Sequence, residues 1–206
     1  RYIELNHLRI VCGYQDAYMC TFGGLNYMDF RGKQFYREAA EELYATVERL
    51  EPYVPYLPFV LVHTGVAHSS DAVHKPLRER WLEGDPEVRQ AYEDIGVLAR
   101  EGKKALLAAD WPRLGRLMNE NHTIQRDLGG SGEVNEELIA IALEHGALGA
   151  KLAGAGGGGT IIALHLHPEE MIAAMRAAGH EMIFRPQPSA GVCLDVTEVP
   201  GDDVSA

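Results

Sequence analysis

Residues 149–164 read Gly-Ala-Lys-Leu-Ala-Gly-Ala-Gly-Gly-Gly-Gly-Thr-Ile-Ile-Ala-Leu, and five of the six residues 154–159 are glycines. The glycines separate a helix-like segment from an apolar run that is typical of a strand. Fixing glycine costs more conformational entropy than fixing any other residue, so a run of glycines indicates a backbone path closed to other side chains. Such a path can direct several backbone N–H groups at one anion, usually a phosphate. The alternative is a glycine-rich hairpin turn that only allows two strands to pack closely.

Two well-known nucleotide motifs do not fit this stretch. A Walker phosphate loop places a lysine after the glycines and continues into a helix, whereas Lys151 precedes the glycines and a strand is expected after them. A dinucleotide-binding fingerprint follows a strand and opens a helix, which is the reverse of the order here. If the stretch binds phosphate, it belongs to another class of site.

The composition indicates a soluble globular chain with enough apolar material for a core. Of the 206 residues, 46% are hydrophobic and 24% are charged. This length fits one large domain, or one domain and part of another. The formal net charge of −11 argues against nucleic acid or an anionic membrane as a partner.

The sequence predicts a cytoplasmic protein. No apolar stretch approaches the roughly 20 residues that span a bilayer, and the first residues are not typical of a signal peptide. The cysteines at 12, 20 and 193 form no Cys-x-x-Cys pair, which favours reduced thiols. The chain begins at Arg1 without methionine and enters at once a segment typical of a domain interior, so we expect a fragment, a processed chain or half of a split protein.

Helical periodicity and capping residues alternate with short apolar runs along the chain. They predict helices over residues 13–22, 34–50, 70–81, 85–99, 110–121, 133–145 and 169–178, and strands over 25–30, 59–62, 160–167, 181–185 and 191–196. The order shows no regular β-α-β alternation, so we expect an α+β fold. Prolines at 52, 55 and 58 mark the best candidate for a domain boundary.

Among the titratable residues, Asp16 has the most promising setting for catalysis. Cys12, Gly13 and Cys20 lie at helical spacing from it and are small, which would leave space for a ligand on that face. A carboxylate facing a cleft can orient or deprotonate a hydroxyl nucleophile. The alternative is a helix aspartate that only faces solvent.

Two motifs in the chain resemble those of the GHMP small-molecule kinases. Gly13-Tyr-Gln-Asp16-Ala-Tyr, followed by Phe22-Gly-Gly-Leu-Asn-Tyr-Met-Asp-Phe30, is similar to one segment of this superfamily. The glycine stretch is similar to the third, C-terminal motif of the superfamily. Two motifs in the correct order are far more specific than either alone, and the resemblance covers nearly the whole chain.

Within the superfamily, the chain most resembles the sugar kinases. Val73-His-Lys-Pro-Leu-Arg-Glu-Arg-Trp-Leu-Glu-Gly-Asp85 is similar to plant-type glucuronokinase, as are Ala105-Leu-Leu and Leu117-Met-Asn-Glu-Asn121. The bacterial heptose-phosphate anomeric kinases share the Gln-Asp and Phe-Gly-Gly signatures. The resemblance implies the tail of an N-terminal kinase domain over residues 1–56, a ferredoxin-like C-terminal domain over 57–199, and a frayed tail over 200–206.

The resemblance also implies an activity and a set of site residues. The implied activity is phosphoryl transfer from ATP to a sugar hydroxyl, and the expected acceptor is the anomeric hydroxyl of a glucuronate-like or heptose 7-phosphate-like substrate. Asp16 matches the catalytic acidic residue, which lies near the accepting hydroxyl. The remaining implied site residues are Gly13, Gly23, Gly24, Thr64 and Ser69 near the substrate, and Lys151, Gly154, Ala155, Gly156, Gly157 and Gly158 in the phosphate region.

The principal ATP motif of the superfamily, a Gly-Leu-Gly-Ser-Ser-Ala loop at a helix N-terminus, does not occur in this sequence. Neither do the serine and glutamate that are expected to hold Mg²⁺. We therefore expect the main elements that bind ATP and Mg²⁺ to lie in a missing N-terminal half, in the same gene or on a companion chain. The alternative to a kinase is a non-catalytic chain that binds a small molecule or pairs with such a partner.

Other polar residues have simpler interpretations. His63, His68 and His74 lie close in sequence, but their spacing matches no zinc pattern, so we expect no metal site in this chain. Thr64 and Ser69 follow a buried strand, where a helix cap is as good an interpretation as a substrate contact. For Arg80, a surface ion pair is favoured over binding of an acidic sugar.

Overall fold

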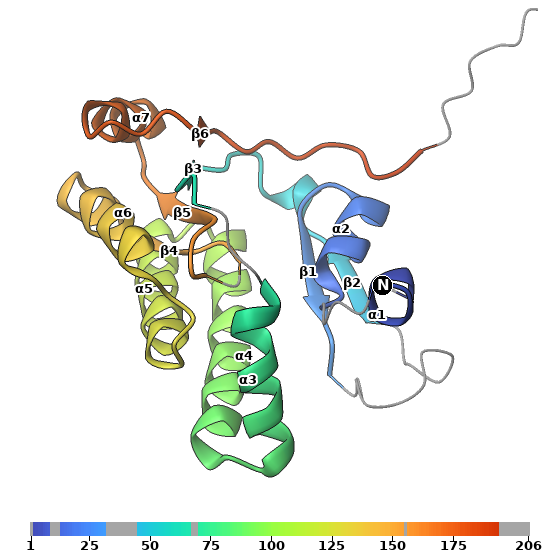
Figure 1. Cartoon of the computed structure of the whole chain (residues 1–206). Coiled ribbons are helices and arrows are strands. Elements are labelled where there is room, and N and C mark those ends of the chain that lie inside the picture. The colour runs from blue at the N-terminus through green and yellow to red at the C-terminus, as the bar shows by residue number, and fades with distance from the viewer. Residues whose placement is uncertain (1, 9–12, 32–44, 67–69, 155, 194–206) are drawn as a thin grey trace, which may run out of the picture.

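The computed structural model describes residues 2–8, 13–31, 45–66, 70–154 and 156–193, and contains two antiparallel sheets (Figure 1). The smaller sheet pairs β1 (Asn26–Asp29) with β2 (Thr46–Arg49). The larger sheet has the strand order β4-β5-β3-β6, made of Gly149–Leu152, Thr160–Leu164, Phe59–His63 and Ile183–Phe184. Each neighbouring pair in it is antiparallel.

The larger sheet has ferredoxin-like connectivity. Four helices join β3 to the β4–β5 hairpin: α3 (Ser70–Glu83), α4 (Pro86–Leu107), α5 (Trp111–Asp127) and α6 (Glu133–Glu144). A fifth helix, α7 (Pro168–Ala177), joins β5 to β6. The first and third strands therefore lie side by side in the middle of the sheet, as in a β-α-β-β-α-β unit. The expected α+β fold with a ferredoxin-like domain is confirmed.

One face of the larger sheet packs against α6 and α7, which Figure 1 shows in yellow-orange and brown. Alternate residues of β3 and β5 enter this core, as the period of two of a strand requires. Its buried members are Val60, Val62, Leu138, Ile139, Ala142, Ala147, Ala150, Ile161, Ala163, Met171 and Met175. The opposite face packs against α4 and α5 through Ala105, Leu114, Met118 and Leu164.

Helix α5 approaches β4 so closely that only glycine fits at the crossing. A Cβ atom at Gly115 would lie 2.4 Å from the carbonyl oxygen of Leu148, and one at Gly149 would lie 2.3 Å from the carbonyl oxygen of Gly115. The Asn119 side chain accepts a hydrogen bond from the Ala150 N–H at 2.9 Å. This side chain therefore satisfies part of the open backbone edge of β4.

The two helices that form the α4–α5 pair begin where their caps predict. The Asp85 carboxylate accepts hydrogen bonds from the backbone N–H groups of Glu87 and Val88, and Pro86 occupies the first helical position. Asp110 accepts from the N–H of Arg113 at 3.1 Å. Both aspartates thus satisfy N–H groups that a helix start leaves unpaired.

The first part of the chain contributes α1 (Tyr2–Asn6), α2 (Gln15–Phe22), the β1–β2 sheet and a 3-10 turn at Glu51–Tyr53. Figure 1 shows α2 beside the β1–β2 sheet, with the segment after β6 passing above both. Gly23 forms an isolated bridge with Ala190, and the Gly24 N–H donates to the carbonyl of Ser189 at 2.7 Å. The C-terminal segment thereby ties this unit to the larger sheet.

Two expectations about elements were wrong in part, and one strand was not expected. Residues 46–49 form β2 and not the end of a helix, because pairing with β1 outweighs their helical pattern; residues 34–44 lie outside the described part. Residues 149–152 form a strand that propensity does not favour. The expected last strand is reduced to the bridge at Ala190, and residues 194–196 lie outside the described part.

The domain division between residues 56 and 57 stays a prediction, with β1–β2 on one side of it and the larger sheet on the other. The predicted frayed tail, 200–206, lies outside the described residues. In the part of the chain that the structure describes, no helix combines the length and the apolar character needed to cross a membrane.

Replacing Gly115 with alanine should lower the free energy of unfolding by about 1–3 kcal/mol, because the added methyl group forces α5 away from β4. Gly96→Ala is the matched control: Gly96 lies inside α4, where the nearest atom to an added Cβ is the flexible end of Arg100 at 3.6 Å. That control should gain up to about 1 kcal/mol from the higher helix propensity of alanine. Urea unfolding measures both free energies. Equal changes in the two variants would contradict the explanation that α5 lies too close to β4 for a side chain at Gly115.

Candidate functional site

The glycine stretch forms the loop between β4 and β5, and its backbone follows a path that favours glycine. Gly156, Gly157, Gly158 and Gly159 have φ angles of 93°, 74°, 141° and 80°. L-residues with a side chain rarely adopt such angles. The Ala153 N–H donates to the carbonyl of Thr160 at 2.9 Å and closes the base of the hairpin. We call residues 154–159 the glycine loop.

One wall of the glycine loop is the turn between α5 and α6. A Cβ atom on Gly156 would lie 1.4 Å from the carbonyl oxygen of Gly130, and one on Gly132 would lie 3.4 Å from the Cα atom of Gly157. Backbone therefore packs directly against backbone on this side. Glycine is favoured in this loop for two reasons: the φ angles are positive, and the neighbouring backbone leaves no room for a side chain at Gly156.

Two further contacts hold the end of the loop. The fully buried Asn135, near the start of α6, donates its side-chain amide to the carbonyl of Gly158 at 3.1 Å. The Thr64 N–H donates to the carbonyl of Gly159 at 2.7 Å, and the Gly159 N–H donates in return to the carbonyl of Val66. The glycine loop thus lies between the α5–α6 turn and the segment that follows β3.

The carbonyl groups of Gly158 and Gly159 accept hydrogen bonds that hold the loop, whereas three of the loop's N–H groups have no described acceptor. Within the described residues, the N–H groups of Gly156, Gly157 and Gly158 donate to no acceptor. Successive free N–H groups in residues of this conformation are suited to an anion. The phosphate region that the sequence predicts stays a prediction, with these three N–H groups available to a ligand among the described residues.

A polar cluster connects the end of α5, the α5–α6 turn and the start of α6. The His122 Nε2 atom lies 3.0 Å from the Glu136 carboxylate, and the Ser131 hydroxyl donates to the same carboxylate oxygen. Burial of the imidazole lowers the pKa of His122, an effect that Glu136 partly opposes. The His122 Nδ1 atom and the Asn135 Oδ1 atom are buried without a hydrogen-bond partner among the described residues.

The sequence analysis did not identify His122, Ser131, Asn135 or Glu136 as site residues. The sequence pointed to this region only through residues 117–121, which lie just before His122 and carry part of the family resemblance. Helical periodicity gives no sign that His122 and Asn135 are buried, because both depend on how α5 and α6 pack. Of these residues, Asn135 holds the glycine loop directly, through the carbonyl of Gly158.

Lys151 lies on β4, immediately before the glycine loop, but its side chain lies between α4 and α5. Its ammonium group donates to the carbonyl of Leu152. Apolar side chains surround the rest of the group, and this burial lowers the pKa of Lys151 to about 8. The structure therefore gives Lys151 an environment distinct from that of the loop.

Asp16 lies in the first turn of α2, and its carboxylate is exposed. Among the described residues it makes no hydrogen bond or ion pair, and none of its described contacts reaches the glycine loop. Gly13 precedes this helix, and an added Cβ there would meet nothing within 4 Å. Cys12 lies outside the described residues, and Cys20 is exposed.

Gly23 and Gly24 have packing roles. A Cβ atom on Gly23 would lie 2.1 Å from the backbone nitrogen of Gly191, and one on Gly24 would lie 2.6 Å from a carboxylate oxygen of Glu51. The Thr64 hydroxyl accepts a hydrogen bond from the Val66 N–H at 3.1 Å, and its backbone holds the glycine loop. Ser69 and Ala155 lie outside the described residues.

The candidate metal ligands are dispersed in the described part of the chain. No group of three or more His, Cys, Asp or Glu side chains there could hold a metal ion. The His63 Nδ1 atom accepts a hydrogen bond from the Gly65 N–H, and His68 lies outside the described residues. Arg80 pairs with Asp85 and Glu87, which confirms its interpretation as a surface ion pair.

Gly156→Ala should disrupt the glycine loop, because the added methyl group has no room beside Gly130. We expect a loss of about 1–3 kcal/mol in the free energy of unfolding and changed amide NMR shifts from residue 130 to 132. Gly154→Ala is the matched control, since an added Cβ at Gly154 meets nothing within 4 Å. The packing account fails if both variants shift the same resonances to the same extent.

Acid should destabilise the protein through His122. The unfolded chain takes up a proton near the ordinary pKa of 6.5, whereas the folded protein, with its lowered pKa, resists protonation. Unfolding is therefore favoured as pH falls below about 6.5, by at most about 1.4 kcal/mol per pH unit for one proton. His122→Gln should flatten this slope, as measured by urea unfolding between about pH 5 and pH 8, and an unchanged slope would contradict the role of His122.

Comparison with known proteins places this geometry in a family. Residues 103–181, from the last turn of α4 to just before β6, match the family model described as GHMP kinases C terminal. The matched region contains the α5–α6 turn, the polar cluster, Lys151 and the glycine loop.

Individual relatives agree with this match. Glucuronokinase 1 from Arabidopsis thaliana is 35% identical over 154 residues, which cover 73% of this chain and 41% of that protein. The crystal structure of L. major mevalonate kinase with R-mevalonate superposes with a TM-score of 0.62 at 25% identity, covering 73% of this chain and 48% of that one. Lactococcus lactis galactokinase, complexed with galactose, has a TM-score of 0.64 at 18% identity and shares the fold, over 92% of this chain and 58% of that one.

The chain spans about two fifths of the length of the glucuronokinase that it matches. The family match, the relatives and the ferredoxin-like sheet with its glycine loop agree on one assignment. The chain belongs to the GHMP kinase superfamily and carries its C-terminal domain.

Proposed function

We propose that the protein acts in an ATP-dependent sugar kinase of the cytoplasm, which phosphorylates a sugar hydroxyl. The observation that carries this proposal is the glycine loop, in which three N–H groups have no described acceptor. The chain that contains it is 35% identical to a glucuronokinase over 154 residues. Phosphoryl transfer depends mainly on positioning and on stabilisation of charge. A loop held by hydrogen bonds at Gly158 and Gly159, with N–H groups that have no described acceptor, would supply both functions beside a phosphate.

The residues present fit one part of an ATP site. The N–H groups of Gly156, Gly157 and Gly158 suit phosphate oxygens, whereas the described carboxylates form no cluster for Mg²⁺. ATP, when bound, supplies the phosphoryl group that is transferred. In this proposal the main ATP loop and the Mg²⁺ ligands come from an N-terminal half, in the same gene product or on a companion chain.

We assign the acid–base role to Asp16. Its carboxylate is exposed in the first turn of α2 and has no described partner that would occupy it. It is therefore free to accept the proton of a substrate hydroxyl as the phosphoryl group is transferred. The proposed substrate contacts are Gly13, Gly23, Gly24, Thr64 and Ser69.

A glucuronate-like acid is the first substrate to test, with phosphorylation at the anomeric hydroxyl. The support is the identity to a protein named glucuronokinase and the similarity of residues 73–85 to that branch. A heptose 7-phosphate is the second candidate. Mevalonate belongs in the same panel, because mevalonate kinases are also among the relatives.

The proposal is tested by ADP release from the complete protein, with its N-terminal half present, over D-glucuronate, D-galacturonate, heptose 7-phosphate and mevalonate. We expect acceptor-dependent release with one sugar, and a product that carries phosphate at the anomeric position. Release with mevalonate alone would contradict the sugar assignment. Absence of release with every acceptor would favour the non-catalytic, partner-pairing alternative.

Asp16→Asn should lower kcat by about 10²- to 10⁴-fold, because the amide cannot accept the hydroxyl proton. Its thermal unfolding should match that of the unmodified protein, since the side chain is exposed and makes no described contact. Glu137→Gln removes an exposed carboxylate from α6 and serves as the control with unchanged kcat. Near-normal turnover in Asp16→Asn would remove Asp16 from the mechanism.

A further inference from the structure

Lys151 differs from the other lysines whose side chains the structure describes. Lys103 pairs with Glu48 and Lys104 pairs with Glu101. Among the described residues, Lys151 has no carboxylate partner, and its ammonium group donates only to the carbonyl of Leu152. An ammonium group has three donors, so at least two N–H bonds remain for another acceptor.

Lys151 lines an open, mostly apolar cavity of about 230 Å³ between α4 and α5. The cavity is lined by Ile95, Leu98, Ala99 and Gly102 from α4, by Leu114, Leu117, Met118 and Asn121 from α5, and by Lys151 from β4. We call it the Lys151 cavity. Apolar walls with a few convergent polar groups are typical of sites for small molecules.

Asn121 is the second polar group of the Lys151 cavity. Its side chain makes no hydrogen bond with any described residue, although its amide offers two donors. Lys151 and Asn121 therefore carry unused donors on two different elements that line the cavity. No carboxylate lines the cavity within the described residues, so these donors have no anionic partner there.

A positive charge in apolar surroundings is unfavourable unless an anion accompanies it. The cost is visible in Lys151, because burial lowers its pKa to about 8. The nearby imidazole of His122 does not supply an anion, and its own pKa is lowered by burial. An anion bound beside Lys151 would remove this cost and would thereby gain affinity.

We propose that the Lys151 cavity binds a small amphipathic monocarboxylate. Its carboxylate pairs with the Lys151 ammonium group and the Asn121 amide, and its apolar body contacts the facing sides of α4 and α5. This site is separate from the sugar and phosphate sites proposed above, and its test does not depend on kinase activity.

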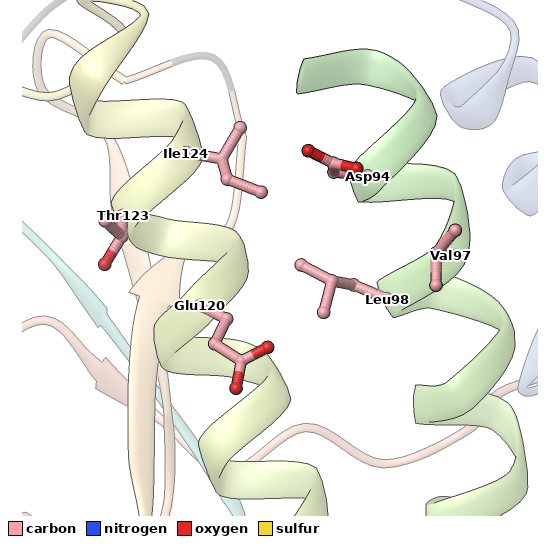
Figure 2. Close-up of a pocket in the computed structure, with 6 residues that line it drawn as sticks. All are labelled: Asp94, Val97, Leu98, Glu120, Thr123 and Ile124. Carbon is pink, nitrogen blue, oxygen red and sulfur yellow. The ribbon is translucent and has the colours of Figure 1, made fainter. Parts of the chain in front are cut away.

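The size of the cavity and its surroundings limit the ligand. A cavity of about 150 Å³ holds benzene, so the Lys151 cavity accommodates one aromatic ring or a short alkyl chain with its carboxylate. Leu98 also lines a neighbouring hollow, where Figure 2 shows Leu98 and Ile124 pointing toward one another. Asp94 and Glu120 line that hollow and would repel a second negative charge, which favours a monoanion.

Hexanoate and benzoate are the probes, titrated into the full chain labelled with ¹⁵N. We expect saturable shifts of amides around the cavity, at Gly102 and Leu117, with a Kd of about 1 mM for molecules of this size. Hexanamide and hexylamine, which lack the anion, should bind at least about tenfold more weakly. The proposal is overturned if hexanoate causes no saturable shift there, or if hexanamide binds equally well.

Two variants separate the charge from the cavity. Lys151→Met keeps the length and apolar stem but removes the charge, and should weaken hexanoate binding at least about tenfold. Lys104→Met is the matched control on α4, with an exposed lysine, and should bind as the unmodified chain does. Ala99→Phe fills the cavity from an exposed position and should abolish binding with Lys151 intact. Unchanged binding in either Lys151→Met or Ala99→Phe overturns the proposal.

Discussion

The close contact between α5 and β4 is the constraint on which the rest of the domain depends. Gly115 and Gly149 allow the two backbones to meet, and Asn119 then bonds to the open edge of β4. Because α5 is one continuous helix, holding its first half against β4 also sets the position in space of its C-terminal end. The α5–α6 turn begins at that end. That turn supplies the carbonyl of Gly130, against which the glycine loop is packed. A structural contact in the sheet therefore determines the position of the candidate site.

In the candidate site, carbonyl groups of the glycine loop bond within the protein, whereas three of its N–H groups have no described acceptor. Carbonyl groups of the loop accept hydrogen bonds from Asn135 and from the segment after β3, which holds the loop in place. The N–H groups of three successive glycines have no described acceptor and are available to a phosphate. Below the loop, Glu136 links Ser131 to a buried His122 whose lowered pKa keeps it neutral. Transfer of a charged phosphoryl group requires preorganised donors, and the hydrogen bonds at Gly158 and Gly159 help to hold these N–H groups in place.

The sequence was sufficient for the features that depend on local chemistry. The aspartate caps at Asp85 and Asp110 predicted the starts of α4 and α5, and the glycines predicted a constrained loop before a strand. Features created by packing could not be predicted: β4 has poor strand propensity and exists because α5 and β5 cover it. The burial of His122 and the direction of the Lys151 side chain likewise depend on neighbours far away in the sequence. The catalytic assignment of Asp16 stays a prediction that rests on the family resemblance.

The central claim is that the glycine loop, braced by the α5–α6 turn, forms a wall of the phosphate site. The most direct measurement is amide NMR of the complete protein, with its N-terminal half, as Mg²⁺ and a non-hydrolysable ATP analogue are added. The account predicts saturable shifts and slower hydrogen exchange at Gly156, Gly157 and Gly158, whose N–H groups have no described acceptor without nucleotide. Nucleotide binding that leaves these three amides unchanged would contradict it.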